Sequence, residues 1–290
     1  PKLAPFIDLN LDDPMNLTEY AKQTGIKGFT LAFAAAANEK CNPMWGGQTK
    51  LDDKNIIKQI DEFKKQGGQV IVSHGGQSGP YLELACNSVD NLTKAYKYIL
   101  DTVGTDHLDL DIEVSLPFDK MSQALVKLQK ERPQTTLSLT LEVQSDDYGL
   151  NDALGFDVLK NLEKHGVRVD IVNPMAMEFW TDKKSWGDAV VNTGNGVLRQ
   201  MKKIWPNKSD AELKSMLGIT PMIGRNFNGK SYLQDHAKQL VHWANDNHIG
   251  RLAFWSMGRD NGGCNGQVSP KCSGVEQHPL DFSNIFKGFQ

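Results

Sequence analysis

The chain has 290 residues, and its 32 Lys and Arg residues against 35 Asp and Glu residues give a formal net charge of −3. General nucleic-acid binding needs a basic face that neutralises phosphates, and this balance argues against it. No stretch approaches the ~20 apolar residues of a membrane-spanning helix. We therefore expect a globular protein whose partners include neither nucleic acid nor a membrane.

Short apolar segments alternate with amphipathic ones along the chain. The apolar segments predict eight strands: Phe6–Asn10, Gly28–Ala34, Gln69–Ser73, Leu108–Glu113, Thr136–Val143, Ile171–Met175, Gly218–Ile223 and Arg251–Ser256. Apolar residues at helical spacing predict helices at Asp53–Gln66, Val89–Val103, Phe118–Gln129 and Tyr232–Asn245, with a short helix opened by a capping box at Ser209–Glu212. Three long loops follow strands, at Ala35–Asp52, Gly75–Ser88 and Glu178–Gly196.

Eight strands that alternate with helices predict a parallel sheet, either open and doubly wound or closed into a barrel. The open sheet would be favoured by a G-x-G-x-x-G turn after the first strand, which is absent, and Gly194-Asn-Gly196 before a later helix is only a weak signal. No Pro/Ser-rich linker divides the chain. We therefore expect residues 1–290 to form one α/β domain, a (β/α)8 TIM barrel, whose long loops build the substrate site.

The most informative segment is Asp106-His-Leu-Asp-Leu-Asp-Ile-Glu113. Side chains alternate faces along a strand, so Asp109, Asp111 and Glu113 share one face and point into the barrel. Burial and like charge raise the pKa values of neighbouring carboxyls unequally, which suits general acid–base catalysis. Two other interpretations are a solvated edge strand and a Mg²⁺ or Ca²⁺ site. We expect neither, and we expect no metal and no cofactor.

The D-x-x-D-x-D-x-E pattern of this segment resembles the signature of glycoside hydrolase family 18, the chitinases and their relatives. Further segments resemble motifs of that family, in the order of the predicted strands: Ser73-His-Gly-Gly76, Asn173-Pro-Met-Ala-Met-Glu178, Pro221-Met-Ile-Gly224 and Phe254-Trp-Ser-Met-Gly-Arg-Asp260. The resemblance covers Pro5 to Cys272. It implies a retaining hydrolase that cleaves β-1,4 bonds beside N-acetylglucosamine by substrate-assisted catalysis, an exception to the usual two-carboxylate scheme.

The resemblance also implies the roles of the three acids. Glu113 protonates the leaving oxygen and later activates water. The substrate's own acetamido oxygen is the nucleophile, and Asp111 holds the acetamido N–H and stabilises the cationic intermediate. Asp109 shares a proton or a hydrogen bond with Asp111. Such catalysis needs no cofactor.

Several residues are expected to bind substrate. Trp255 would form an apolar floor under the sugar. The other candidates are Ser73, Gly75, Gly76, Met175, Met177, Glu178, Arg225, Asn226 and Trp45. Trp45, Trp180 and Trp186 lie on predicted rim loops, where a sugar subsite and plain packing are both open. His74 is interpreted as loop packing.

One departure from the family pattern concerns the acetamido group. Many members carry a tyrosine where this chain has Met177, followed by Asp or Asn where it has Glu178, and Phe6 also stands where tyrosine is common. Each change removes a polar group from the pocket. The resemblance therefore allows a modest rate or a preference for a sugar other than plain chitin.

Four cysteines, with no C-x-x-C pair, argue against a zinc site. From the residues alone they fit either two disulfides in an oxidising compartment or four reduced thiols. The resemblance to bacterial members implies the pairs Cys41–Cys86 and Cys264–Cys272. We accordingly expect a secreted protein whose signal peptide is not part of this chain.

The function expected from the resemblance is hydrolysis of chitin and chito-oligosaccharides by a monomeric enzyme. Two alternatives share the fold. One is an endo-β-N-acetylglucosaminidase acting on glycoprotein glycans, and the other is a non-catalytic chitin- or glycan-binding lectin. Such lectins typically lack the last acid of the signature, whereas Glu113 is present.

Overall fold

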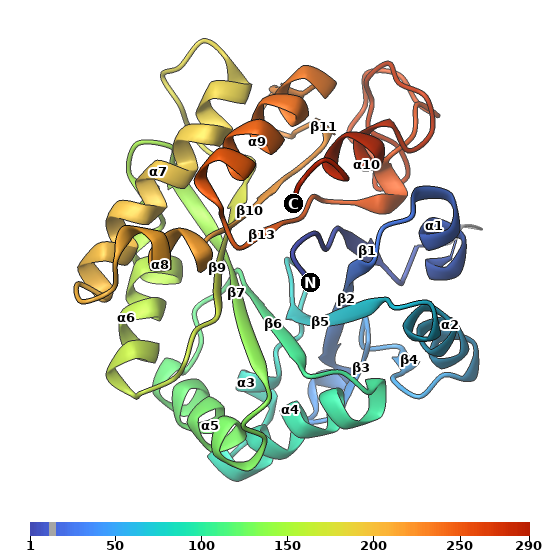
Figure 1. The fold of residues 1–290 in the computed structure, drawn as a ribbon. Coiled ribbons are helices and arrows are strands. Elements are labelled where there is room, and N and C mark those ends of the chain that lie inside the picture. Colours follow the sequence, from blue (N-terminus) through green and yellow to red (C-terminus); the bar gives the residue numbers. More distant parts are fainter. Residues whose placement is uncertain (12–15) are drawn as a thin grey trace.

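A computed structural model describes residues 1–11 and 16–290. Parallel strands form a ring at the centre, and helices surround it (Figure 1). The strands of the ring are β1 Phe6–Asp8, β2 Gly28–Ala36, β5 Gln69–Gly75, β6 His107–Ile112, β7 Thr136–Ser145, β9 Ile171–Ala176, β10 Gly218–Pro221 and β13 Arg251–Leu252. Each predicted strand is present, with ends that shift by a few residues.

The ring closes between its last and first strands. The sheet runs from β2 through β5, β6, β7, β9 and β10 to β13, and β1 pairs with β2. At the seam, the N–H of Ala4 donates to the carbonyl of Leu252 (2.9 Å), the N–H of Phe6 to Phe254 (3.1 Å) and the N–H of Leu252 to Lys2 (2.8 Å). The predicted barrel is thus confirmed, and the open doubly wound sheet is excluded.

Amphipathic helices cover the outside of the ring. They are α1 Leu17–Thr24, α2 Lys54–Lys65, α4 Val89–Val103, α5 Phe118–Glu131, α6 Asp157–Lys164, α7 Trp186–Ile204, α9 Gln234–Asn247 and α10 Asp281–Phe286, with the shorter α3 Leu82–Ala85 and α8 Asp210–Ser215. The expected capping box opens α8, where Ser209 and Glu212 bond reciprocally. Within the described residues, no helix is long and apolar enough to cross a bilayer.

Short strands decorate the loops of the barrel. They are β3 Pro43–Trp45 and β4 Thr49–Lys50 beside β2, β8 Gly149–Leu150 beside β7, and the hairpin of β11 Gly224–Arg225 with β12 Ser231–Tyr232. Each belongs to a connection that leaves the carboxyl end of a ring strand. The loops at that end are therefore partly ordered by their own hydrogen-bonded ladders.

The predicted loop Glu178–Gly196 is wrong from residue 186 onward, because α7 begins at Trp186. Glycine costs a helix about 1 kcal/mol relative to alanine, so a segment with three glycines did not predict a helix. Tertiary packing explains two of them. A Cβ at Gly194 would lie 2.5 Å from the ring of Trp243, and one at Gly196 would lie 2.5 Å from the carbonyl oxygen of Asp146.

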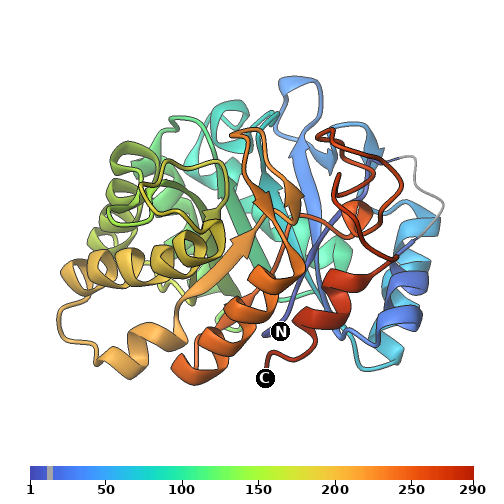
Figure 2. The same cartoon turned by 90° about the horizontal axis from the view of Figure 1, so that it is seen from above.

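Both chain termini lie at one end of the barrel (Figure 2). Lys2 and Leu3 bond or pair with Leu252, near the beginning of the last ring strand. Lys2 Nζ also lies 5.8 Å from the ring centroid of Phe289, the penultimate residue of the chain. The amino ends of the ring strands thus share one end of the molecule with both termini.

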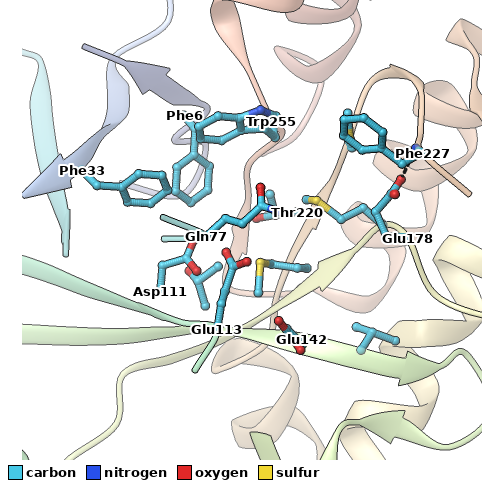
Figure 3. A pocket seen from close by; sticks show the side chains of 15 residues that line it. Phe6, Phe33, Gln77, Asp111, Glu113, Glu142, Glu178, Thr220, Phe227 and Trp255 are labelled. Carbon is cyan, nitrogen blue, oxygen red and sulfur yellow. Dashed lines mark hydrogen bonds between the residues drawn. The ribbon is translucent and has the colours of Figure 1, made fainter. Parts of the chain in front are cut away.

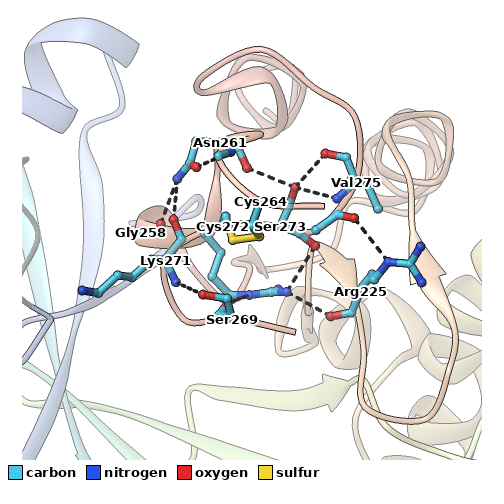
Figure 4. The surroundings of a disulfide bond; sticks show 12 residues. Arg225, Gly258, Asn261, Cys264, Ser269, Lys271, Cys272, Ser273 and Val275 are labelled. Carbon is cyan, nitrogen blue, oxygen red and sulfur yellow. Dashed lines mark hydrogen bonds between the residues drawn. A yellow bond between two sulfur atoms is a disulfide. The ribbon is translucent and has the colours of Figure 1, made fainter. Parts of the chain in front are cut away.

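All four cysteines pair as the family resemblance implies. Cys41–Cys86 joins the connection after β2 to the connection after β5, and Cys264–Cys272 closes a turn between β13 and α10. The second bridge lies in a loop where many side chains hydrogen-bond to backbone groups (Figure 4). Each bridge therefore fixes a loop at the carboxyl end of the ring.

The two disulfides are expected to contribute unequally to stability. Their sequence separations are 45 and 8 residues, so chain entropy assigns about 4 kcal/mol to Cys41–Cys86 and about 2.5 kcal/mol to Cys264–Cys272. The paired variants Cys41→Ala/Cys86→Ala and Cys264→Ala/Cys272→Ala should therefore lose free energy of unfolding in that order. Denaturant titration measures both, and the reverse order would contradict the entropic account.

Candidate active site

One cavity opens at the carboxyl ends of the ring strands and has a volume of about 550 Å³. Its lining comes mostly from the last residues of the strands and the first residues of the loops (Figure 3). The lining residues are Phe6, Phe33, Gln77, Asp111, Glu113, Thr140, Glu142, Val143, Met175, Met177, Glu178, Thr220, Met222, Phe227 and Trp255. Two of the three expected catalytic acids, the expected floor tryptophan and three further predicted residues thus share one cavity.

Asp109 lies deeper in the barrel than the other two acids. Its carboxylate accepts hydrogen bonds from Ser73 Oγ on β5 (2.7 Å) and from Ser138 Oγ (2.6 Å) and Thr140 Oγ1 (2.8 and 3.0 Å) on β7. Burial raises the pKa of Asp109, and these hydroxyls act in the opposite direction. Within the described residues its side-chain hydrogen bonds run to these hydroxyls, and the hydrogen bond to Asp111, one of the two predicted forms of their interaction, is not among them.

Asp111 instead interacts with Glu113. Burial, and then the charge and a side-chain hydrogen bond of Glu113, hold the pKa of Asp111 well above its usual range. Among the described residues, Asp111 Oδ1 has no hydrogen-bond partner, although its side chain is only 3% exposed and lines the cavity. A buried acceptor without a partner is costly, so this atom is ready for a donor from a ligand.

An aromatic wall faces these acids across the cavity (Figure 3). The rings of Trp255 and Phe33 are stacked, with centroids 5.7 Å apart and planes 11° apart, and Phe6 is tilted against Trp255 at 5.7 Å. The orientation of the Trp255 indole is thereby fixed by its contacts with the rings of Phe33 and Phe6. Flat apolar surface opposite carboxylates suits a sugar, which has apolar C–H faces and polar edges.

Glu178 lies at the other side of the cavity and is held by the hairpin of β11 and β12. Its Oε1 accepts the N–H of Phe227 (2.6 Å), and its own N–H donates to Asn226 Oδ1 (3.3 Å). Burial raises the pKa of Glu178. Met175 and Met177 line the cavity beside it. Phe227, 76% exposed, stands at the mouth.

Six other predicted substrate residues do not line the cavity, and for them the structure gives other roles. Trp45 is fully buried in the apolar core beside β2, so the expectation of a rim subsite there is wrong. Asn226 is 3% exposed and donates to the carbonyls of Met222 and Gly224, so it orders the hairpin. Arg225 Nε donates to the carbonyl of Gly274 in the loop of the second disulfide (Figure 4).

The remaining three belong to the end of β5. Ser73 is the hydroxyl donor to Asp109. Gly75 and Gly76 have φ values of 113° and 88°, which favour glycine, and a Cβ on Gly75 would lie 2.2 Å from the carbonyl oxygen of Asp111. These three residues, at the end of β5, therefore support the neighbouring strand β6, which carries the acids. Trp186, the other rim candidate besides the exposed Trp180, is 5% exposed and packs on Phe179.

Glu142 is the most consequential lining residue that the sequence did not single out. It follows Ser138 and Thr140 at every second position of β7, so strand alternation puts all three on the face that Asp109 and Glu113 share. That alternation was the available signal. Burial, and then the charge of Glu113, raise the pKa of Glu142. Phe33, Val143 and Thr220, which lie on the ring strands β2, β7 and β10, were also missed. So were Gln77, Met222 and Phe227, which lie in loops, where there is no periodicity to read.

No group of three or more His, Cys, Asp or Glu side chains within residues 1–11 and 16–290 is arranged to hold a metal ion. The polar groups that converge on the cavity include carboxylates, the amide of Gln77, methionine sulfurs and two threonine hydroxyls. They are placed for acid–base chemistry and hydrogen bonding around an uncharged, partly apolar ligand.

Known proteins resemble this chain in sequence and in fold. A family model described as glycosyl hydrolases family 18 matches residues 13–239. The chain is 30% identical to a probable bifunctional chitinase/lysozyme of Escherichia coli K12 and 29% identical to endochitinase 11 of Metarhizium anisopliae, over 99% and 89% of its own length. It spans only 34% and 52% of the length of these two relatives.

Active domain 2 of a thermostable chitinase from Pyrococcus furiosus, solved as catalytic-site mutants with chito-oligosaccharides, is 38% identical. The two structures superpose with a TM-score of 0.93, over 98% of this chain and 93% of that one. The barrel fold, the family match and these chitinase relatives together define the class of the glycoside hydrolases. The chain belongs to glycosyl hydrolase family 18.

The raised pKa of Asp111 has a consequence for stability. Because the folded pKa exceeds the unfolded value of about 3.9, the folded state binds the extra proton, and this contribution to stability falls as pH rises between the two values. Asp111→Asn removes that titration. At pH 7 we expect its Tm to exceed the wild-type Tm by about 2–4 °C, the shift that ~1 kcal/mol gives.

Calorimetry at pH 7 and at pH 4 checks this expectation. The difference in Tm should shrink toward zero at the lower pH, where the wild-type carboxyl is protonated. Asp182→Asn, which changes an exposed carboxyl on the β9–α7 connection, serves as the control and should leave Tm unchanged at both pH values. An Asp111→Asn variant that melts below the wild type at pH 7 would contradict the assignment.

Proposed function

We propose that this chain hydrolyses chitin and chito-oligosaccharides, with retention, by substrate-assisted catalysis. The observation that carries the proposal is the single cavity in which Asp111 and Glu113 face the stacked pair of Trp255 and Phe33. The 38% identity to a domain solved with chito-oligosaccharides supports this class of substrate. We propose that residues 1–290 act as one catalytic unit and as a monomer, since one chain supplies the whole lining.

In the proposed reaction, Trp255 supports the apolar face of the sugar whose bond is cleaved. Glu113 donates a proton to the leaving oxygen while the acetamido oxygen of the same sugar attacks its anomeric carbon. Asp111 Oδ1, which has no partner among the described residues, accepts the acetamido N–H. The carboxylate then stabilises the positive charge of the cyclic intermediate, and Glu113, now a base, activates water to open it.

The apolar side chains of Met177 and Phe6 leave the acetamido oxygen without the tyrosine hydroxyls that are common in the family. Thr220, which lines the cavity, donates its hydroxyl proton to Asn173 Oδ1 (2.8 Å), so it is not free to replace them. Asp111 therefore carries more of the orientation of the acetamido group here. We propose that the rate is modest for this reason.

The mouth of the cavity suits a chain longer than one sugar. Phe227 is 76% exposed at the lining, and Trp180, 69% exposed, lies on the β9–α7 connection that also carries Glu178. Exposed aromatic rings bind the apolar faces of successive sugars. The two disulfides support a place in an oxidising compartment, and we propose that the enzyme is secreted.

Glu113→Gln tests the assignment of the acid. The amide has the same shape but cannot protonate the leaving oxygen, so we expect kcat on chitotetraose to fall about 10²–10⁴-fold with binding retained. Mass spectrometry of the products and calorimetric titration of the oligosaccharide measure the two quantities. Glu142→Gln, an equivalent change from β7 in the same cavity, should cost far less, and equal losses in the two variants would remove the special role of Glu113.

A thiazoline derivative of chitobiose, which mimics the cyclised intermediate, tests the nucleophile. It should inhibit competitively, and Asp111→Ala should weaken it roughly 10–100-fold, the value of one hydrogen bond to a charged group. Dialysis against a chelator should leave kcat unchanged. Loss of activity on chelation together with indifference to the thiazoline would overturn the substrate-assisted mechanism.

A further inference from the structure

We infer that Tyr81 is a positioning residue that holds the backbone of Glu113, and hence the general acid, in place, an inference that rests on the proposed function. Tyr81 lies on the β5–α4 connection, outside the residues that line the cavity, and is 5% exposed. Its hydroxyl contacts the backbone at the end of β6, the strand that carries the acids. The family motifs that the sequence displays do not include it.

Three backbone groups converge on this hydroxyl. It accepts the N–H of Glu113 (2.9 Å), and it lies within donating distance of the carbonyls of Gly76 (2.7 Å) and Asp111 (3.0 Å). The hydroxyl therefore joins the residue after β5 to the two catalytic positions at the end of β6. A phenylalanine ring would occupy the same space and make none of these bonds.

The N–H of Glu113 needs this acceptor because the sheet has ended. β5 ends at Gly75, which pairs with Asp111, and the last pair between β6 and β7 is Ile112 with Leu141. Glu113 stands two residues beyond the last pair on the β5 side and one residue beyond the last pair on the β7 side. Backbone donors in half-buried positions require a partner, and the Tyr81 hydroxyl supplies it.

The ring of Tyr81 is itself held tightly. A Cβ on Gly75 would lie 2.8 Å from its Cε2, and a Cβ on Gly79 would lie 2.9 Å from its Cδ1, so both neighbours lack a side chain where the ring passes. The His74 ring packs edge-on against it, with centroids 5.8 Å apart. Close packing on several sides leaves the hydroxyl one direction in which to point.

The segment that follows Tyr81 is anchored to the barrel by a buried ion pair. Glu83 Oε1 lies 2.9 Å from His74 Nε2, both side chains are 1% exposed, and the other Glu83 oxygen accepts from Tyr96. The pair holds the pKa of Glu83 below its usual range against burial. Three residues further, Cys86 is bonded to Cys41. Because the ion pair and the disulfide hold the β5–α4 connection rigidly, the Tyr81 hydroxyl can fix the position of the Glu113 backbone N–H.

Tyr81→Phe tests the inference, with two aryl glycosides of chitobiose as probes. Phenol is a poor leaving group and needs the acid, so kcat for the phenyl glycoside should fall about 10–100-fold when the acid is misplaced. Dinitrophenol leaves without a proton, so kcat for that glycoside should fall less than about threefold. KM should change little for either probe. The ratio of the two rates does not depend on the fraction of folded enzyme.

Two references frame the result. Glu113→Gln defines the selective loss expected when the acid is removed altogether. Tyr232→Phe removes a buried hydroxyl that donates to the carbonyl of His236 at 3.2 Å, away from the acidic strand, and should leave the ratio at its wild-type value. Equal losses on both glycosides, or no loss, in Tyr81→Phe would overturn the inference while the proposed function stands. A wild-type chain inert to both probes would refute the proposed function and this inference with it.

Discussion

The buried carboxylate of Asp109 is the constraint on which the site depends. Burying a charge is costly unless hydrogen bonds satisfy it, and hydroxyls from both neighbouring strands do so. The hydrogen bonds continue across the barrel, from Asn173 Nδ2 to Thr140 (3.1 Å) and from Thr220 to Asn173 (2.8 Å). Slipping any of these strands by one residue would turn its polar group outward, so the layer fixes the register of the ring.

The cavity is built on top of this polar layer, and its two sides have opposite character. On one side β6 and β7 present carboxylates, and on the other Trp255, Phe33 and Phe6 form a nearly continuous aromatic surface. Burial, and then the charge and the hydrogen bond of Glu113, raise the pKa of Asp111, so this carboxyl keeps its proton at a pH where an isolated aspartate would lose it. The burial that comes with the shape of the cavity therefore also raises the pKa of Asp111.

Strand periodicity and a family signature were enough to predict the barrel and its acids, because both depend on residues close together in sequence. The residues that escaped prediction depend on tertiary contacts. Gly194 and Gly196 lie in a helix at positions where Trp243 and the carbonyl of Asp146 leave no room for a side chain. Trp45 was expected at the rim, but β3 folds back onto β2 and buries it. Tyr81 belongs to no sequence motif or periodic pattern, since its role depends on the position of its hydroxyl group in the folded chain.

The position of the termini has a practical consequence for attaching the chain to a support. Both ends of the chain lie beside the amino ends of the ring strands, whereas the cavity opens at the carboxyl ends (Figure 2). A bead, a surface or a fused protein attached at either terminus therefore lies on the opposite side of the barrel from the cavity, and the face with the cavity stays accessible. The chain can therefore be immobilised through either terminus without blocking the entrance of the cavity.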